Sequence, residues 1–455
     1  MSSNPLKKMT IDSSWILSFK EEASEAFTEK SPFKPKAVFC DGQIRLMRGH
    51  QDDFITWDEY IFQQFHNHVR KFYENASTVI LAFDDYEHVP QAKCMTQVKR
   101  RKHLPKLDIL AREPLPPFPP SGERWSQHIA NRTFKSKVIA LVIQELPRLL
   151  RLKPGQTLVI DYAGCPVEYS VGEDGGSVTR ELTDLMPMGE ADVKFTRYAE
   201  MYRDLMVDSV DGDSIPIALV YYEACLRDLT GGSMRAADLQ AGPPRISIYR
   251  MTTRLAEEKK KRKEMGEKCR TFEYVNIGVL YQMLADVFAQ CMGRMFSPTH
   301  SQHLMKMTVV LIGLTGTDFT RSLPQVSGKS VFTFLPDLLM ALVRCFDPIS
   351  GQINVRLGAD HLVSAIYTCK FESHLKGVAG GLDSTLCTLQ CSKLSQRTKD
   401  SLPSAGVVLC TLRNINWLLK YWAEPTLTPD PLLIEHGEAV YGFVRHRGAV
   451  AYSHE

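Results

Sequence analysis

Residues 77–85 read STVILAFDD, a short apolar run rich in β-branched residues that ends on two aspartates. Runs of this length and composition are typical of buried strands, because branched side chains pack well on a pleated sheet. The segment GEDGG, at 172–176, is typical of a hairpin turn. Four further runs predict strands, at residues 37–40 (AVFC), 157–162 (TLVIDY), 167–171 (VEYSV) and 215–222 (IPIALVYY).

Helical segments separate these runs. Apolar residues recur at spacings of three and four over 57–76 and 134–152, and a third helix is predicted over about 190–205. Strands and helices that alternate over about 37–220 predict a mostly parallel sheet covered by helices. In such sheets, ligands bind at the carboxyl ends of the strands. After residue 220 we expect a solvated charged helix at 254–270, apolar helices at about 273–294 and 301–314, and a mainly helical remainder.

The composition is that of an ordinary globular protein. Of 455 residues, 44% are hydrophobic and 24% are charged, and the formal net charge is +3. A charge so close to zero gives no ground for nucleic-acid binding, which must rest on local patches. The 11 cysteines are irregularly spaced and odd in number, which predicts reduced thiols in an intracellular protein, cytoplasmic or nuclear. No apolar run reaches the ~20 residues of a membrane span, so no membrane association is expected.

Acidic residues are predicted to gather at the carboxyl edge of this sheet. Asp41, Asp84 and Asp211 each follow an apolar run, whereas Glu190 and Asp192 stand in the first turn of a predicted helix. Taken singly, such residues are usually turn residues, helix N-caps or partners of the helix macrodipole. Taken together, close carboxylates repel one another unless cations lie between them. Two Mg²⁺ or Mn²⁺ ions about 3.5–4 Å apart would make them a phosphodiester-cleaving site. The candidate metal ligands are Asp41, Asp84, Glu190, Asp192, Asp211, Asp213 and Asp318, and all but Asp41 and Asp318 are also the candidate catalytic residues.

A basic segment follows the aspartates that end residues 77–85. If it is helical, its polar side chains lie on roughly one face, where arginine offers a bidentate fork to phosphate and lysine a point charge. The alternative is a solvated basic face or a nuclear-localisation patch in VKRRKH. The candidate phosphate-binding residues are Lys93, Gln97, Arg100 and Arg101.

The order of these blocks resembles the FEN/XRN superfamily of 5′ nucleases, which includes flap endonucleases and XRN-type 5′→3′ exoribonucleases. The basic residues fall at the spacing with which XRN-type enzymes hold a 5′ phosphate. MGEADVK resembles the XRN-type GEGExK, with GEAD in place of GEGE and Lys194 on the matching lysine. The resemblance covers about residues 37–330 and rests on AFDDYEHVPQAKCMTQVKRR (82–101), MGEADVK (188–194), VDSVDGDSIPIAL (207–219) and LIGLTGTDFTRSLP (311–324).

The resemblance implies an α/β, PIN-like (Rossmann-like) fold with an appended helical region. The core would span residues 1–330, with insertions at about 113–130, 162–186 and 223–272, and residues 331–455 would form the helical C-terminal region. It also implies an Mg²⁺- or Mn²⁺-dependent nuclease with two ions, acting 5′→3′ on RNA or DNA with a free, phosphorylated 5′ end. Two alternatives stay open: a structure-specific DNA flap endonuclease, and an inactive nucleic-acid-binding or scaffold member of the fold.

Overall fold

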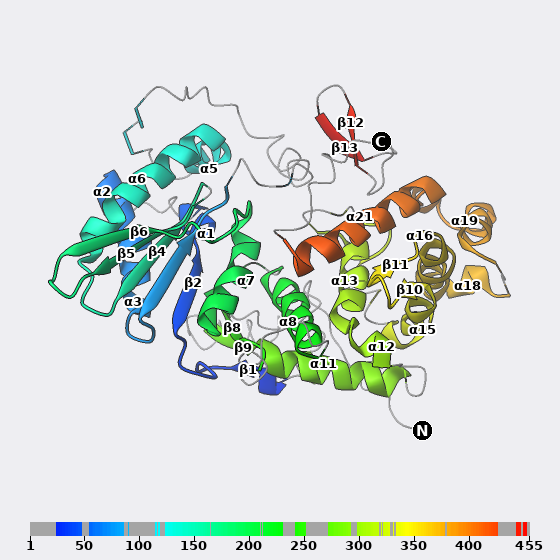
Figure 1. Ribbon diagram of the computed structural model, residues 1–455. Helices are drawn as coiled ribbons and strands as arrows, with labels where there is room; N and C mark the ends of the chain where they lie inside the picture. Colours follow the sequence, from blue (N-terminus) through cyan, green and yellow to red (C-terminus); the bar gives the residue numbers. More distant parts are fainter. Residues whose placement is uncertain are drawn as a thin grey trace, which may run out of the picture.

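A computed structural model gives the arrangement of the chain (Figure 1). It describes residues 24–47, 54–85, 90, 114–115, 117–118, 123–163, 165–209, 211, 213–230, 242–251, 272–292, 298–317, 320, 322–327, 331, 334–377, 380–425, 443–446 and 449–452.

The described residues form a central sheet of nine strands in the order β1-β9-β8-β7-β2-β3-β4-β5-β6. The five strands from β8 to β4 in this order are parallel, and the pairs at both edges are antiparallel. The predicted mostly parallel α/β sheet is therefore confirmed. Its strands are β1 (Phe27–Thr28), β2 (Ala37–Asp41), β3 (Thr78–Ala82), β4 (Thr157–Asp161), β5 (Val167–Val171), β6 (Ser177–Glu181), β7 (Asp204–Asp208), β8 (Arg245–Met251) and β9 (Phe272–Asn276).

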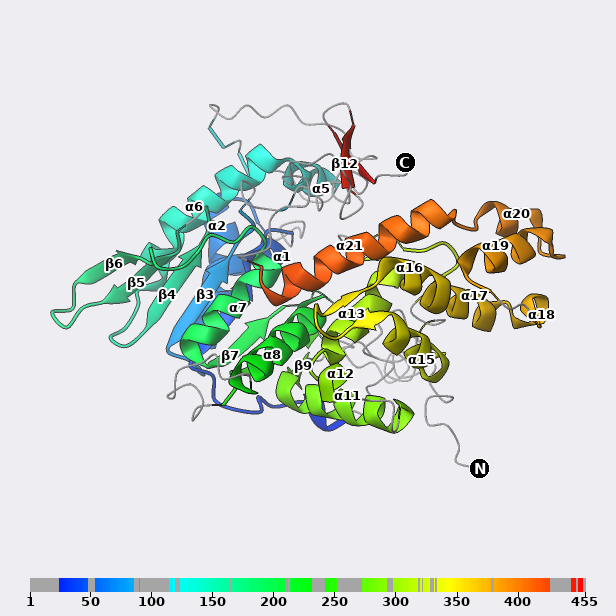
Figure 2. The same ribbon diagram turned by 45° about the vertical axis from the view of Figure 1, so that its right-hand side comes forward.

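Helices cover both faces of the sheet, as the alternation of strands and helices predicts. Every residue of β2 and β3 is buried, so neither strand shows polar alternation. Val38 and Leu81 point into one apolar cluster, which also contains side chains of α3 (Asn67–Phe72) and α6 (Arg132–Leu150). Phe39 and Ile80 point into the other cluster, with α7 (Ala191–Tyr202) and α8 (Ser214–Thr230). Figure 2 shows α6 and α7 on opposite sides of the sheet.

The C-terminal part is mainly helical, as predicted, and its helices continue the second apolar cluster. In that cluster α21 (Ala405–Ala423) packs on α13 (Leu304–Thr315) and on α8.

None of the described helices is long and apolar enough to cross a membrane. The remaining elements are η3 (Ser24–Ala26), α1 (Gly42–Met47), α2 (Trp57–Ile61), the π-helical η4 (Phe62–His66), α5 (Glu123–Ala130), α11 (Ile277–Met292), α12 (Pro298–Ser301), α15 (Leu335–Cys345), β10 (Phe346–Asp347), β11 (Gln352–Ile353), α16 (Val355–Leu357), the π-helical η6 (Gly358–Val363), α17 (Ser364–Lys370), α18 (Glu372–Leu375), α19 (Leu382–Cys391), α20 (Gln396–Asp400), β12 (Phe443–His446) and β13 (Ala449–Tyr452).

One predicted strand is wrong. Residues 215–222 lie inside α8, which packs against α7, α11, α13 and α21. An apolar run that is buried on nearly all sides has neither a helical nor a strand period, so the sequence cannot separate the two. Strand β8 lies in no predicted element, and β9 falls at the start of the helix predicted over 273–294. The charged helix predicted over 254–270 lies outside the described residues.

A buried glutamate joins α8 to the start of α13. The Glu223 carboxylate accepts hydrogen bonds from the backbone N–H groups of Met305, at 2.8 Å, and Lys306, at 3.4 Å. It thereby caps N–H groups that have no partner within their own helix. Burial raises the pKa of Glu223 from 4.5 to about 8, against the lowering effect of these hydrogen bonds.

The raised pKa predicts a pH dependence of stability. Above about pH 4.5 the unfolded chain ionises at Glu223 before the folded chain does, so the free energy of unfolding falls until about pH 8. We expect Glu223→Gln to remove this contribution. Denaturant unfolding of both proteins at pH 5 and pH 8 should show a smaller loss of stability in the variant. Equal losses in the two proteins would show that Glu223 does not titrate in this range.

Candidate metal centre

Three carboxylates lie at the carboxyl ends of adjacent parallel strands. Asp41 is the last residue of β2, which pairs with β3 on one side and with β7 on the other. Asp84 stands two residues after the end of β3, and Asp211 three residues after the end of β7. The sheet thus brings three predicted ligands to its carboxyl edge, which is the edge predicted from the sequence.

The start of α7 contributes two further acidic residues, Glu190 and Asp192. Glu190 is the N-cap residue, with 1% of its surface exposed, and the partly exposed Asp192 stands in the first turn. The N–H of Ala191 donates to Asp84 Oδ1 at 3.0 Å, and the N–H of Asp85 donates to the Gly189 carbonyl at 2.6 Å. Asp84 therefore does act as a helix cap, but for a helix more than a hundred residues away in sequence. This cap fixes α7 beside the end of β3.

The electrostatics of Asp41 show that the carboxylates interact. Burial raises the pKa of Asp41 well above its usual value, and the negative charges of Asp192, Asp84 and Asp211 raise it further. A hydrogen bond from the Gln43 N–H to Asp41 Oδ1, at 2.8 Å, opposes these effects. Like charges gathered at a buried carboxylate are unfavourable without a cation. An all-carboxylate donor set of this kind suits hard divalent cations such as Mg²⁺ and Mn²⁺.

The segment between β7 and α8 orients Asp211 and Asp213. Asp211 is exposed, and its Oδ1 accepts from the Asp213 N–H at 3.1 Å. The carbonyl of Asp213, the residue directly before α8, accepts from the Ile217 N–H at 3.1 Å. The turn presents the Asp211 carboxylate at the same edge as Asp41.

Five predicted site residues lie outside the described residues, and their roles stay predictions. One is the late metal ligand and four are the phosphate-binding side chains: Asp318, Lys93, Gln97, Arg100 and Arg101.

A glycine follows Asp41 because there is no room for a side chain. A Cβ on Gly42 would lie 2.5 Å from the Phe83 ring and 2.8 Å from the Ala82 carbonyl oxygen. Phe83 directly precedes Asp84, so the chain after β2 and the chain after β3 lie in close contact here.

A buried ion-pair network fixes α7 against the sheet. Lys194 Nζ donates to the Phe83 carbonyl at 2.7 Å and to Asp161 Oδ1 at 2.9 Å. Asp161 Oδ2 accepts from Arg197 and, at 2.8 Å, from the Tyr198 hydroxyl. Burial raises the pKa of Asp161, but the charges of Lys194 and Arg197 outweigh burial and hold it below its usual value. The network places the first turn of α7 next to Asp84.

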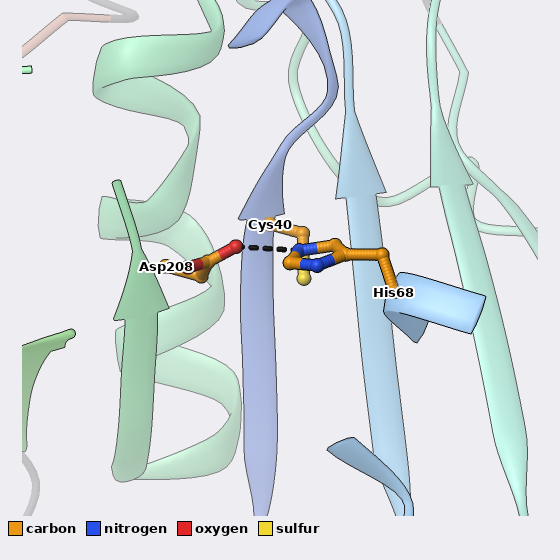
Figure 3. A group of neighbouring side chains, drawn as sticks. All are labelled: Cys40, His68 and Asp208. Atoms are coloured by element: carbon orange, nitrogen blue, oxygen red, sulfur yellow. Dashed lines mark hydrogen bonds and ion pairs between the residues drawn. The ribbon is translucent and has the colours of Figure 1, made fainter. Parts of the chain in front are cut away.

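Cys40, which directly precedes Asp41, forms a second cluster with His68 and Asp208 (Figure 3). Cys40 and Asp208 are paired residues of neighbouring strands. His68 Nε2 lies 2.6 Å from Asp208 Oδ2, and Arg45 Nη2 donates to the same oxygen at 3.0 Å. Burial lowers the pKa of His68 to about 4, so the neutral ring donates its Nε2–H to Asp208. Burial alone would raise the pKa of Asp208, but His68 and Arg45 hold it at about 2.

The ligand atoms of Cys40, His68 and Asp208 all lie within 4.8 Å of one another. A thiolate, an imidazole and a carboxylate form a set that suits Zn²⁺. However, the Arg45 guanidinium already bonds the carboxylate, and burial raises the pKa of the Cys40 thiol well above its usual value. We therefore interpret the cluster as hydrogen-bonded support that joins α1, α3 and β7 beneath the acidic edge.

Sequence reasoning missed Asp208, Asp161 and His68. Asp208 and Asp161 end apolar runs, the same signal that identified Asp41, and could have been found in that way. His68 gives no such signal, because its partner is distant in the sequence.

Comparisons with known proteins give likenesses to solved structures. No protein-family model and no curated protein matches the chain. Among solved structures, the chain is similar to the catalytic core of Rad2 in complex with DNA substrate. The match has 13% sequence identity and a TM-score of 0.37, and it covers 91% of this chain and 95% of that chain. At this identity and score the likeness supports no activity, and the carboxylates remain the basis for one.

Proposed function

We propose that this chain is a divalent-metal-dependent nuclease that hydrolyses phosphodiester bonds of RNA or DNA from a phosphorylated 5′ end, acting 5′→3′. One observation carries the proposal: carboxylates from the ends of three neighbouring parallel strands and from the start of α7 share one electrostatic environment. Carboxylates gathered in this way suit catalysis by paired metal ions.

The residues divide into metal ligands and groups that hold them. Asp41, Asp84, Asp192 and Asp211 would bind the ions, together with Glu190, Asp213 and Asp318. When bound, two Mg²⁺ or Mn²⁺ ions lower the pKa of an attacking water and stabilise the leaving oxygen. Lys194 and Asp161 would hold the start of α7, which carries Glu190 and Asp192, beside Asp84 at the end of β3.

The basic segment would select the end of the substrate. Lys93, Gln97, Arg100 and Arg101 would bind a terminal 5′ phosphate through charge-assisted hydrogen bonds. A strand that begins with a 5′ hydroxyl lacks this anchor. We therefore expect 5′-phosphorylated strands to be cleaved preferentially.

A cleavage assay tests this proposal. Single-stranded RNA, single-stranded DNA and a 5′-flap duplex, each with 5′ phosphate or 5′ hydroxyl, are incubated with Mg²⁺ or with EDTA. We expect Mg²⁺-dependent release of nucleotides from a 5′-phosphorylated single strand, about 100-fold slower for Asp211→Ala. The matched control is Asp174→Ala, in the hairpin turn between β5 and β6, which should cleave like the wild type.

Each other outcome has a definite meaning. Endonucleolytic cleavage confined to the flap duplex would establish the flap-endonuclease alternative. Binding of nucleic acid without cleavage would establish the inactive alternative. Equal cleavage by the wild type and Asp211→Ala would contradict the proposed site.

A further inference from the structure

A cationic cavity opens at the edge of the sheet opposite the acidic residues. It has a volume of about 440 Å³ and lies between the carboxyl ends of α3 and α6. The Tyr73 hydroxyl donates to the carbonyl of Thr157, the first residue of β4, at 3.0 Å. The cavity therefore adjoins the amino ends of β3 and β4, whose first residues Thr78 and Thr157 are paired. Its lining includes His66, Arg70, Tyr73, Glu74, Arg151 and Lys153.

The charge of the lining favours an anion. Arg70, Arg151 and Lys153 supply three positive charges, and Glu74 supplies one negative charge. Within the described part of the chain, no carboxylate lies within 4.0 Å of these three cations. The net charge of +2 matches a phosphate monoester, which carries nearly two negative charges at pH 7. A phosphodiester carries only one.

The backbone of the cavity wall is unusual at two points. Arg151 is the C-cap residue of α6 and has the left-handed conformation, with φ 46° and ψ 65°, which glycine most often adopts at helix ends. His66 ends a π-helical turn, a rare feature that is frequent at functional sites. Arg151 thus keeps a disfavoured conformation at a position that also lines the cavity.

The size of the cavity indicates more than a phosphate group. A volume of about 440 Å³ falls in the range of small-molecule pockets. The rings of His66 and Tyr73 line the same space, and a planar group attached to the phosphate could pack against them. We propose that this cavity binds a phosphate monoester that carries a planar ring, of which a mononucleotide is the simplest probe. The proposal does not depend on the nuclease activity.

Calorimetric titration in EDTA with AMP, adenosine and the dinucleoside ApA, which has no terminal phosphate, tests this inference. We expect AMP to bind in this cavity, apart from any binding to the proposed 5′-phosphate segment, and adenosine and ApA to bind there at least about tenfold more weakly. Arg151→Gly should weaken AMP binding about tenfold while leaving the thermal midpoint unchanged or raised, because glycine suits the left-handed position. Arg70→Ala should weaken AMP binding similarly.

The matched control is Arg148→Ala. Arg148 lies one turn earlier on α6, is 71% exposed, and pairs with Glu145 at 3.6 Å outside the cavity. Its loss changes the net charge equally and should leave AMP binding unchanged. The inference fails if AMP does not bind, if it binds no better than ApA, or if Arg151→Gly and Arg70→Ala bind AMP as the wild type does. In those cases the three cations only stabilise the C-terminal end of the α6 macrodipole or interact with solvent.

Discussion

Asp192→Asn is expected to abolish stabilisation by Mg²⁺ and to lower cleavage by about 10²–10³-fold, without unfolding the protein. Asp192 is the carboxylate whose charge raises the pKa of Asp41 most strongly after burial itself. Asparagine keeps the size of the side chain but removes this charge. In the metal-free protein the remaining carboxylates therefore repel one another less. The loss of an acidic first-turn residue of α7 costs about 0.3–1 kcal/mol and partly offsets this gain.

Thermal unfolding with and without Mg²⁺ measures this effect. A ligand at 100 times its Kd stabilises the folded state by about 2.7 kcal/mol, so wild-type unfolding should shift upward in Mg²⁺. Asp192→Asn should show no shift. The control Asp174→Asn makes the same substitution in the β5–β6 turn, where the side-chain oxygen accepts from the Gly176 N–H. It should shift as the wild type does. An unchanged shift in Asp192→Asn would remove Asp192 from the metal centre.

Asp161→Ala is expected to cost about 3–5 kcal/mol of the free energy of unfolding. The substitution leaves Lys194 and Arg197 buried at 1% and 7% side-chain exposure without their carboxylate. Because a domain is typically stable by only about 5–15 kcal/mol, the variant approaches the limit of folding. The register of α7 against β3 should also loosen, since Lys194 bonds the Phe83 carbonyl as well as Asp161.

Denaturant unfolding compares this variant with Glu168→Ala. Glu168 pairs with Arg180 at 3.1 Å across β5 and β6, but Arg180 is 65% exposed. Loss of an exposed pair should cost no more than about 1 kcal/mol. The double variant Asp161→Ala/Lys194→Met should cost less than the sum of its single variants, since it removes one unpaired cation. Equal costs for Asp161→Ala and Glu168→Ala would contradict the structural role of the network.

The parallel centre of the sheet is predictable because local sequence determines it. Strands β2, β3 and β4 are short apolar runs between helices. The rule that ligands bind at the carboxyl ends of such strands makes Asp41 and Asp84 candidate site residues. Glu190 and Asp192 followed from the start of the next helix. Sequence order was enough to expect Asp84, Asp192 and Asp211 near Asp41, whose pKa their charges raise. That these residues bind metal stays a prediction.

The rest depends on contacts that sequence order does not contain. The run at 215–222 is apolar because it is buried on nearly all sides as a helix, so composition alone favours the wrong element. The partners of the buried charges lie far apart: Lys194 and Asp161 are separated by 33 residues, and His68 and Asp208 by 140. Gly42 is required only because Phe83 approaches it across the sheet.

The number of Mn²⁺ ions bound per chain tests the proposed metal centre most directly. Electron paramagnetic resonance measures free Mn²⁺ during a titration of the purified chain. We predict that the wild type binds two Mn²⁺ ions and that Asp84→Asn/Asp211→Asn binds fewer than one over the same range. If the wild type binds none, or if the double variant binds as many ions as the wild type, the acidic edge is not a metal centre.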